Sequence, residues 1–159
     1  MRDEPRVATP SQTVGPFFHV GLTRQPGVGK PGAHAGDGIR LRVAVTDGDG
    51  RAVDDALVEL WYGDVFGRMP TGKDGICEFD IARPAAHINV CLFARGLLRQ
   101  LHTRIYFAGG PALAEDAVLA LVPDDRRGTL LAHPDPHDAG RWLFHVRLQG
   151  SQETVFFDP

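Results

Sequence analysis

Hydrophobic and polar side chains alternate along much of the chain, and the clearest stretch covers residues 39–46. Its odd-numbered positions are Ile, Leu, Val and Val, whereas Arg40 and Arg42 fall between them. Side chains of a β-strand point alternately to its two faces, so this pattern places every large hydrophobic side chain on one face. It therefore predicts a half-buried strand.

Six further segments predict strands, either by the same alternation or by their β-branched and aromatic content. They cover residues 57–62, 76–81, 87–94, 101–107, 128–132 and 141–148. Turn-forming residues separate them, as in the Asp-Gly-Asp-Gly run at 47–50. Short strands with turn signals between them are typical of sandwich folds, so the sequence predicts an all-β fold, a β-sandwich of about seven to eight strands.

Two parts of the chain do not follow the strand pattern. Residues 113–121 predict one short helix, which Pro123 closes. Residues 1–38 show little periodicity. Within them, residues 9–19 predict an extended N-terminal arm, because a residue before proline is driven out of the helical region. Residues 25–38 are dense in Gly and Pro and predict an irregular connection.

The length of 159 residues fits one domain with one core. We expect a single domain over residues 1–159, with the arm and the irregular connection at 1–38 and the sandwich at 39–159. The 19 glycines and 12 prolines favour a fold rich in turns over a helical bundle. A formal net charge of -3 gives no electrostatic reason to expect a nucleic acid or an anionic membrane as partner.

The sequence also bears on the cellular location of the protein and on the redox state of its cysteines. The first residues lack the basic and then apolar pattern of a signal peptide, and no apolar run approaches the roughly 18 residues of a membrane helix. We therefore expect a reducing, cytoplasmic location. Cys77 and Cys91 lie in apolar runs, where a free thiol behaves as a small buried hydrophobic group. The sequence leaves open whether they pair across strands.

The first candidate site is the pair His87 and Asn89 in a predicted strand. A His-x-His pair on a strand places both imidazoles on one face, where they can share a metal ion. Here an amide stands at the second place, and an amide oxygen is a poor substitute for imidazole at a transition metal. The pair therefore predicts a chain built like a metalloenzyme that does not itself hold the metal.

Two other hypotheses stay open. His133, Asp135 and His137 lie within five residues and could ligate a metal, although the prolines between them indicate an exposed loop. A self-sufficient metalloenzyme would combine His87 with His133 and His137. A non-enzymatic β-sandwich interaction module is the other alternative, because an arm and the edge strands of a sheet could recruit many kinds of partner.

Three blocks of the sequence together resemble the intradiol ring-cleaving dioxygenases. They are the arm at 9–19, the stretch 86–107 with AHINVCLFARG and HTRIYF, and the ending LQGSQETVFFD at 148–158. Residues 43–61 carry a weaker likeness. The resemblance is to the alpha-type chain of the two-chain members, and it implies a β-sandwich. It also implies that a partner beta subunit binds Fe(III) through two tyrosines and two histidines, and that the alpha chain has lost the metal but closes the site.

The ligand pattern of the family can be compared with this sequence position by position. His87 stands at the first histidine and Asn89 at the second. Met69 falls near the first tyrosine position, and residues 82–85 contain no tyrosine. Three of the four ligands are absent by this comparison. The resemblance therefore implies that this chain binds no metal and holds no catalytic residue alone, and that the Fe(III) cofactor belongs to the partner.

The resemblance implies a substrate-pocket role for Thr13, Gly15, Pro16 and Arg95, which would face the partner's iron. Thr13 can hydrogen-bond a substrate oxygen, and Gly15 permits a close approach of the backbone. Pro16 supplies a stiff wall, and the Arg95 guanidinium suits a carboxylate. The implied reaction cleaves protocatechuate with O2 to 3-carboxy-cis,cis-muconate in aromatic catabolism. The segments around 25–38 and 66–75 look short for an alpha-type chain.

Overall fold

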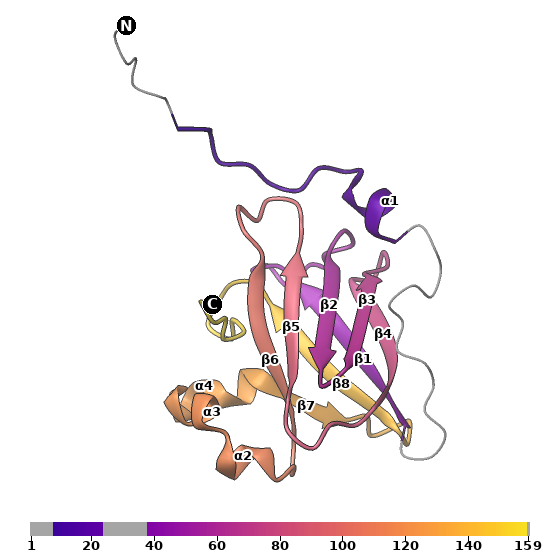
Figure 1. The fold of residues 1–159 in the computed structure, drawn as a ribbon, viewed down its shortest axis with the longest axis vertical. Coiled ribbons are helices and arrows are strands. Elements are labelled where there is room, and N and C mark those ends of the chain that lie inside the picture. Colours follow the sequence, from indigo (N-terminus) through magenta and orange to yellow (C-terminus); the bar gives the residue numbers. More distant parts are fainter. Residues whose placement is uncertain (1–7, 24–37, 159) are drawn as a thin grey trace, which may run out of the picture.

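The computed structural model describes residues 8–23 and 38–158 of the chain, and these are dominated by strands (Figure 1). The strands are β1 (Gly38–Thr46), β2 (Leu57–Tyr62), β3 (Val65–Pro70), β4 (Ile76–Ala82), β5 (Ile88–Phe93), β6 (Leu101–Phe107), β7 (Leu131–Pro134) and β8 (Arg141–Arg147). They form one eight-stranded sheet in the order β3-β2-β5-β6-β7-β8-β1-β4. The predicted all-β class is confirmed.

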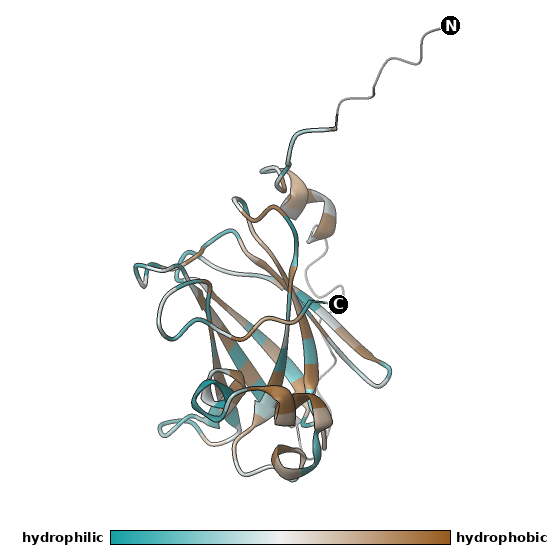
Figure 2. Ribbon diagram, turned by 90° about the vertical axis from the view of Figure 1, so that its left-hand side faces the viewer, coloured by the Kyte–Doolittle hydropathy of each residue, from teal (hydrophilic) through white to brown (hydrophobic). Residues whose placement is uncertain are grey.

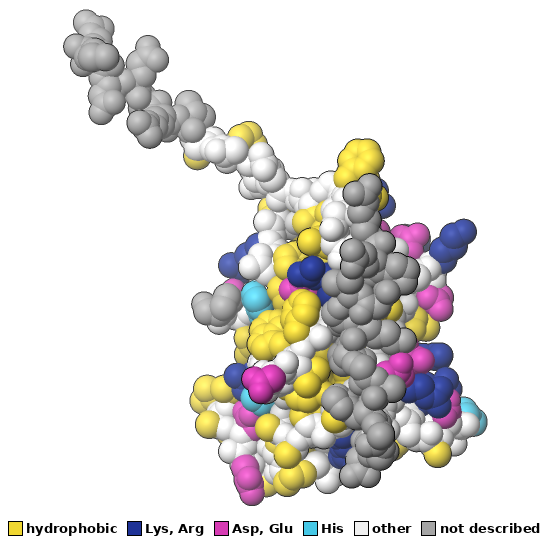
Figure 3. Space-filling view, turned by 45° about the vertical axis from the view of Figure 1, so that its right-hand side comes forward, with side chains coloured by type: hydrophobic (Ala, Val, Ile, Leu, Met, Phe, Trp, Pro, Cys, Tyr) yellow, Lys and Arg dark blue, Asp and Glu magenta, His cyan; other side chains and the backbone are white. Residues whose placement is uncertain are grey.

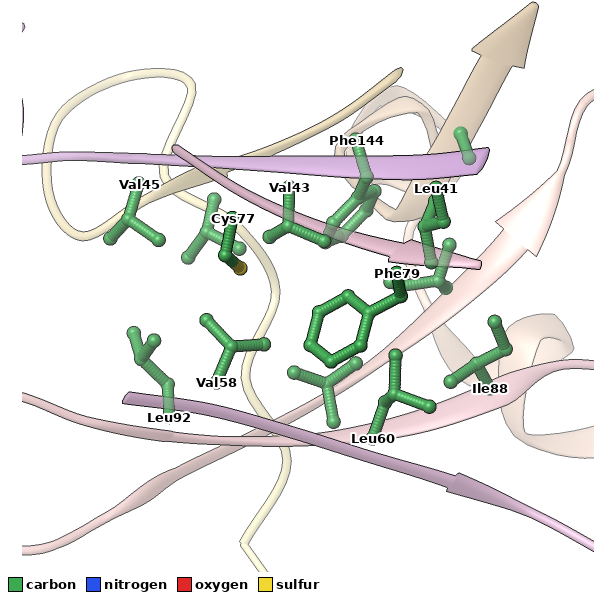
Figure 4. Packing of buried hydrophobic residues seen from close by; sticks show 14 of the residues in the cluster. Leu41, Val43, Val45, Val58, Leu60, Cys77, Phe79, Ile88, Leu92 and Phe144 are labelled. Carbon is green, nitrogen blue, oxygen red and sulfur yellow. The ribbon is translucent and has the colours of Figure 1, made fainter. Parts of the chain in front are cut away.

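The core lies between two halves of this sheet. Figure 4 shows Leu41 and Phe79, from β1 and β4, pointing toward Leu60 and Ile88, from β2 and β5. All four side chains are fully buried, and each such burial stabilises the fold by about 2 kcal/mol. Figure 2 shows the underlying pattern as alternating hydrophobic and hydrophilic bands along the strands.

The strand at residues 39–46 is confirmed with its predicted faces. Along β1, buried and half-buried positions alternate without a break, and the arginines Arg40 and Arg42 are on the half-buried side. β1 pairs with β4 in antiparallel register and with β8 in parallel register. Because the eight strands form one continuous order, the finer description as a sandwich stays a prediction.

Two strands differ from the sequence-based prediction. β3 was not expected, because Gly67 and Pro70 weaken the strand pattern, yet it pairs with β2 along its whole length. The two strands are joined by a tight turn that contains Gly63 at φ 50°, a conformation that favours glycine. The strand expected at 128–132 begins later, as β7, because Gly128–Leu130 forms a 3-10 turn instead.

The prediction of one short helix is wrong. Four short helices occur in the described residues: α1 (Phe18–Leu22), α2 (Ala112–Glu115), α3 (Ala117–Leu121) and α4 (Asp124–Arg127). The segment expected as a single helix breaks at Asp116, whose carboxylate accepts hydrogen bonds from the N–H groups of Val118 and Leu119 at 2.9 Å each. Asp116 thereby caps α3 and takes an extended backbone, which ends α2. Pro123 follows α3, as expected.

The arm is extended only in part. It ends in α1, where the Phe18 ring centroid lies 6.4 Å from that of Phe93 on β5. The adjacent Phe17 is 80% exposed. One of the two aromatic side chains therefore covers the sheet, and the other does not. Figure 3 shows the described part of the arm projecting from the body of the protein.

Some predictions fall on residues outside the described ranges. Residues 1–7 and most of the irregular connection, 24–37, lie outside the described residues, so the arm and connection are followed only from 8 to 23. Within the described ranges, no helix has the length and hydropathy needed to cross a membrane. Cys77 and Cys91 are both free and buried, which resolves the open question of their pairing.

Candidate functional site

The arm meets the loop between β5 and β6 through one hydrogen bond. The backbone N–H of Gly96 donates to Thr13 Oγ1 at 2.8 Å. Gly96 has a φ of 92°, which glycine adopts without strain, so the chain can turn sharply at this point. Beside the bond lies a hollow of about 250 Å³, whose lining includes Gln12, Val14, Phe93, Leu97 and Leu98.

Arg95 lies directly before Gly96 and forms an ion pair with Asp55 through its Nε. Asp55 belongs to the segment that leads into β2. The Arg95 side chain remains 54% exposed, so the carboxylate orients the guanidinium without covering it. The hydrogen bond that Arg95 donates to Asp55 also raises the pKa of Arg95, which therefore stays charged at every physiological pH.

Gly15 and Pro16 lie on the exposed surface of the arm, two and three residues beyond Thr13. The Gly15 carbonyl accepts a hydrogen bond from the Phe18 N–H at 3.2 Å, at the turn that opens α1. A Cβ added at Gly15 would meet nothing within 4 Å. The described residues of this chain therefore do not need a glycine there, and any close approach would have to come from another molecule. The pocket roles of these residues stay predictions.

His87 lies just before β5 in a compact polar cluster. Its Nδ1 is 3.1 Å from Asp116 Oδ2, and its ring centroid is 5.5 Å from that of Tyr106. Asp116 Oδ1 lies 3.5 Å from the Arg104 guanidinium. Neighbouring Asn89 donates instead to the Trp61 carbonyl at 3.5 Å. His87 and Arg104 thus both face Asp116, and among the described residues His87 Nδ1 has no partner in hydrogen-bond geometry.

The electrostatics of this cluster favour a neutral imidazole beside a charged carboxylate. Burial and the nearby Arg104 cation hold the pKa of His87 below its ordinary value, although Asp116 opposes them. Burial alone raises the pKa of Asp116, but hydrogen bonds from the N–H groups of Leu119 and Val118 and from Tyr106 bring it below the usual value. Asp116 is therefore ionised and already used as a helix cap.

These residues do not fit a ferric ion. The resemblance implies a ferric ion held by two tyrosinates, and hard anionic oxygens of that kind stabilise the +3 state. The Tyr62 hydroxyl donates to the Ala82 carbonyl at 2.7 Å, and burial raises the pKa of both Tyr62 and Tyr106. A cationic guanidinium, Arg104, also stands within the cluster. Among the residues at 8–23 and 38–158, no three His, Cys, Asp or Glu side chains gather in a way that could hold a metal.

The position at which the resemblance expects the first tyrosine is equally unsuited. Met69 lies on β3 opposite Val58 of β2, and its side chain packs against the hydrophobic core. A thioether in that environment offers a ferric ion no hard anionic ligand.

The second proposed metal cluster has a structural role. The Asp135 carboxylate accepts hydrogen bonds from the His137 N–H at 2.8 Å and from Arg141 Nε at 2.6 Å. These bonds, chiefly that from His137, hold the pKa of Asp135 below its ordinary value. Asp135 thus shapes the turn that connects β7 and β8. His133 and His137 do not join His87 in any group of three ligating side chains in the described part of the chain.

Two residues of the site were missed by sequence reasoning. Asp116 had a readable signal, because an aspartate directly before an apolar run is typical of a helix cap. The continuous helical pattern across residues 113–121 hid it. Asp55 had no such signal, because its ion pair joins Arg95 from 40 positions away in sequence.

The comparisons with known proteins agree with this architecture. No protein-family model matches the chain. The protocatechuate 3,4-dioxygenase alpha chain of Burkholderia cepacia is 37% identical over 94% of this chain and 96% of its own length. The alpha chain of Pseudomonas putida is 35% identical over the same shares. The beta chain of B. cepacia is 25% identical over 97% of this chain and 81% of its own length.

Solved structures show the same fold at lower identity. The dioxygenase domain of a dioxygenase and carbohydrate-binding fusion from Streptomyces sp. SirexAA-E has a TM-score of 0.59 and 22% identity, over 92% of this chain and 99% of that domain. Catechol 1,2-dioxygenase from Acinetobacter sp. ADP1 has a TM-score of 0.57 and 19% identity, over 79% of this chain and 58% of that enzyme.

This likeness shows that the chain has the fold of the intradiol ring-cleaving dioxygenases. At 37% and 35% identity over nearly the whole chain, it belongs to the family of protocatechuate 3,4-dioxygenase alpha chains, which are subunits of such enzymes. The resemblance read from the sequence is confirmed. The alignment with the B. cepacia chain spans 192 positions, more than the 159 residues present, so this chain is shortened internally relative to that one.

Proposed function

We propose that this chain is the metal-free alpha subunit of a cytoplasmic protocatechuate 3,4-dioxygenase, and that it completes the active site of a beta subunit that holds Fe(III). The observation that carries this proposal is the hydrogen bond between Gly96 and Thr13, because it fixes the arm against the loop that presents Arg95. The donor set around His87, which does not fit a ferric ion, supports the assignment of the metal to the partner.

Each pocket residue has a physical role in this proposal. The Thr13 hydroxyl accepts from Gly96 and still has its own O–H to donate to a substrate oxygen. Gly15 leaves an open surface on the arm, and Pro16 stiffens the backbone beside it. Arg95 offers the donors that Asp55 does not use to the substrate carboxylate.

The proposed reaction cleaves the ring bond between the two hydroxyl-bearing carbons of protocatechuate. Both atoms of O2 enter the product, 3-carboxy-cis,cis-muconate, so the reaction needs no other oxidant or reductant. When bound in the beta subunit, Fe(III) supplies the activation of the substrate toward O2. This chain orients the substrate through Thr13 and Arg95 and excludes water with the arm.

Co-expression with a beta chain that carries a His-x-His pair and two ligand tyrosines tests this function. We expect the two chains to purify as one complex that consumes O2 and protocatechuate in equal amounts. The matched control is the beta chain expressed without this chain, which should be much less active. Failure of the chains to associate, or equal activity of the beta chain alone, would contradict the proposal.

A further inference from the structure

The largest of the described cavities lies on the outer side of β1, β7 and β8. It measures about 510 Å³, which is within the range of sites that bind small organic molecules. Ala44 on β1 lies opposite His145 on β8, with Arg42 and Thr46 as its neighbours on the same face. Because a methyl group stands in a row of longer side chains, the sheet is hollowed at this position.

The charges around this cavity have one sign. Its lining includes Arg42, Arg147, His133 and His145, and none of the described residues that line it carries a carboxylate. Anions are attracted to such a concave surface, because the guanidinium groups of Arg42 and Arg147 act on the same small volume.

Arg147 is the group best placed to bind an anion. Among the described residues, nothing forms a hydrogen bond or an ion pair with its guanidinium. Arg42 differs, because its Nε lies 3.4 Å from Glu78 Oε2 on β4 and is partly neutralised. His145 is held by a hydrogen bond between its Nε2 and Thr46 Oγ1 at 2.9 Å. The cavity thus contains a fixed imidazole next to a free guanidinium.

The rest of the cavity is apolar. Leu131, at the start of β7, and Leu143 on β8 form part of its wall, and Thr129 adds a hydroxyl. A ligand that matches this lining carries a negative group at one end and an apolar body at the other. A guanidinium binds a carboxylate through two parallel N–H donors, and a ring of benzoate size fits within the volume.

We propose that this cleft binds a small aromatic carboxylate, whose carboxylate pairs with Arg147 beside His145 and whose ring packs on Leu131 and Leu143. The proposal does not depend on the proposed function, because it concerns binding to this chain's own residues. The small side chain of Ala44 leaves room for the ring in this proposal, since a larger side chain at that position fills the same space.

Titration of the full chain with benzoate, followed by calorimetry and by NMR of the His145 and Leu143 signals, tests the proposal. We expect saturable binding that Arg147→Gln weakens at least tenfold, with Arg51→Gln, on an exposed arginine elsewhere, as the matched control. Ala44→Leu should abolish binding while its circular dichroism stays that of the parent chain. Benzamide and inorganic phosphate should bind at least tenfold more weakly than benzoate.

Three results would overturn the proposal. One is the absence of saturable benzoate binding. Another is equal binding by the parent chain and Arg147→Gln, which would place the ligand elsewhere. The third is phosphate binding as tight as that of benzoate, which would show a general anion surface with no selection for an apolar body. None of these measurements uses the beta subunit or enzymatic activity, so their failure leaves the proposed function untouched.

Discussion

At the residue scale, Arg95 carries the largest share of the proposed function. Its guanidinium is oriented by Asp55 and remains about half exposed, on the loop whose next residue, Gly96, donates to Thr13 of the arm. An arginine that served only the stability of this chain would contribute little, since exposed ion pairs are worth about 0 to 1 kcal/mol. Replacement of Arg95 should therefore change the activity of the assembled enzyme and not the stability of the isolated subunit.

We predict that Arg95→Ala lowers kcat/KM of the assembled enzyme for protocatechuate by about 10- to 100-fold, because a charge-assisted hydrogen bond to the substrate is worth about 1.5 to 3 kcal/mol. Iron content should not change. Arg51→Ala is the matched control, since Arg51 is exposed, is paired with Asp49 and does not line the hollow. An unchanged kcat/KM in Arg95→Ala, or a parallel loss of iron, would contradict the pocket role.

The cysteines make a second prediction at this scale. Burial raises the pKa of the Cys77 thiol to about 12 and that of Cys91, which also lies near Glu59, to about 11. Since the thiolate is the reactive form, neither should react with a disulfide reagent at pH 8 in the folded chain. Two thiols should be released on unfolding in guanidinium. Rapid reaction of either cysteine without denaturant would show that the strand around it opens.

At the scale of elements, the strands with clear alternation were predictable and the interruptions were not. The faces of β1 follow from its sequence alone. β3 was missed because its stability comes from pairing with β2, which propensity does not report. The break between α2 and α3 depends on two hydrogen bonds to Asp116, a local choice that the helical pattern around it conceals.

The candidate site divides in the same way. Thr13, Gly15, Pro16 and Arg95 were chosen by family resemblance, and only the structure shows that Thr13 reaches the loop of Arg95. That contact joins positions 83 residues apart, and no periodicity in the sequence encodes a pairing of that range.

The helix cap formed by Asp116 should contribute to the stability of the folded chain. Asp116→Ala removes the cap of α3 and leaves Arg104 without its carboxylate, so we expect the free energy of unfolding to fall by about 1 to 3 kcal/mol. Asp116→Asn is the matched control, because its amide oxygen can still accept from the helix N–H groups and should restore part of the loss. Urea unfolding measures all three chains. Equal stability of Asp116→Ala and the parent chain would contradict a stabilising role for this helix cap.

At the scale of the whole molecule, two half-buried histidines couple stability to pH. Burial is the main cause that lowers the pKa of both His87 and His145, and a neighbouring arginine adds to it in each case. The unfolded chain therefore binds protons near pH 6.5 that the folded chain does not. Folding is then most stable above about pH 7, and stability is lost as the pH falls through about 6.5.

We predict that the urea midpoint falls between pH 7.5 and pH 5.5, and that it falls less in His145→Gln, because one of the two responsible groups is removed. Above pH 7 the two chains should show parallel behaviour, which serves as the internal control. A midpoint that rises as the pH falls would have the opposite sign and would contradict the neutral state of these histidines in the fold.

The proposed function depends on which subunit holds the iron. The chain has the fold of a family that uses iron, yet its own donors around His87 are committed to Asp116, Arg104 and Tyr106. In the proposed function, this chain shapes a reaction site without supplying its metal. The claim is most directly tested on the isolated chain, because no partner can then contribute a ligand.

The decisive measurement is the iron content of the isolated full-length chain after loading with ferric iron and treatment with a mild chelator. A true protein site resists such chelation. We predict that the isolated chain retains far less than one iron per chain and does not cleave protocatechuate. Its complex with a beta subunit should retain iron and cleave protocatechuate. One chelation-resistant ferric ion per isolated chain, together with ring cleavage, would contradict the account.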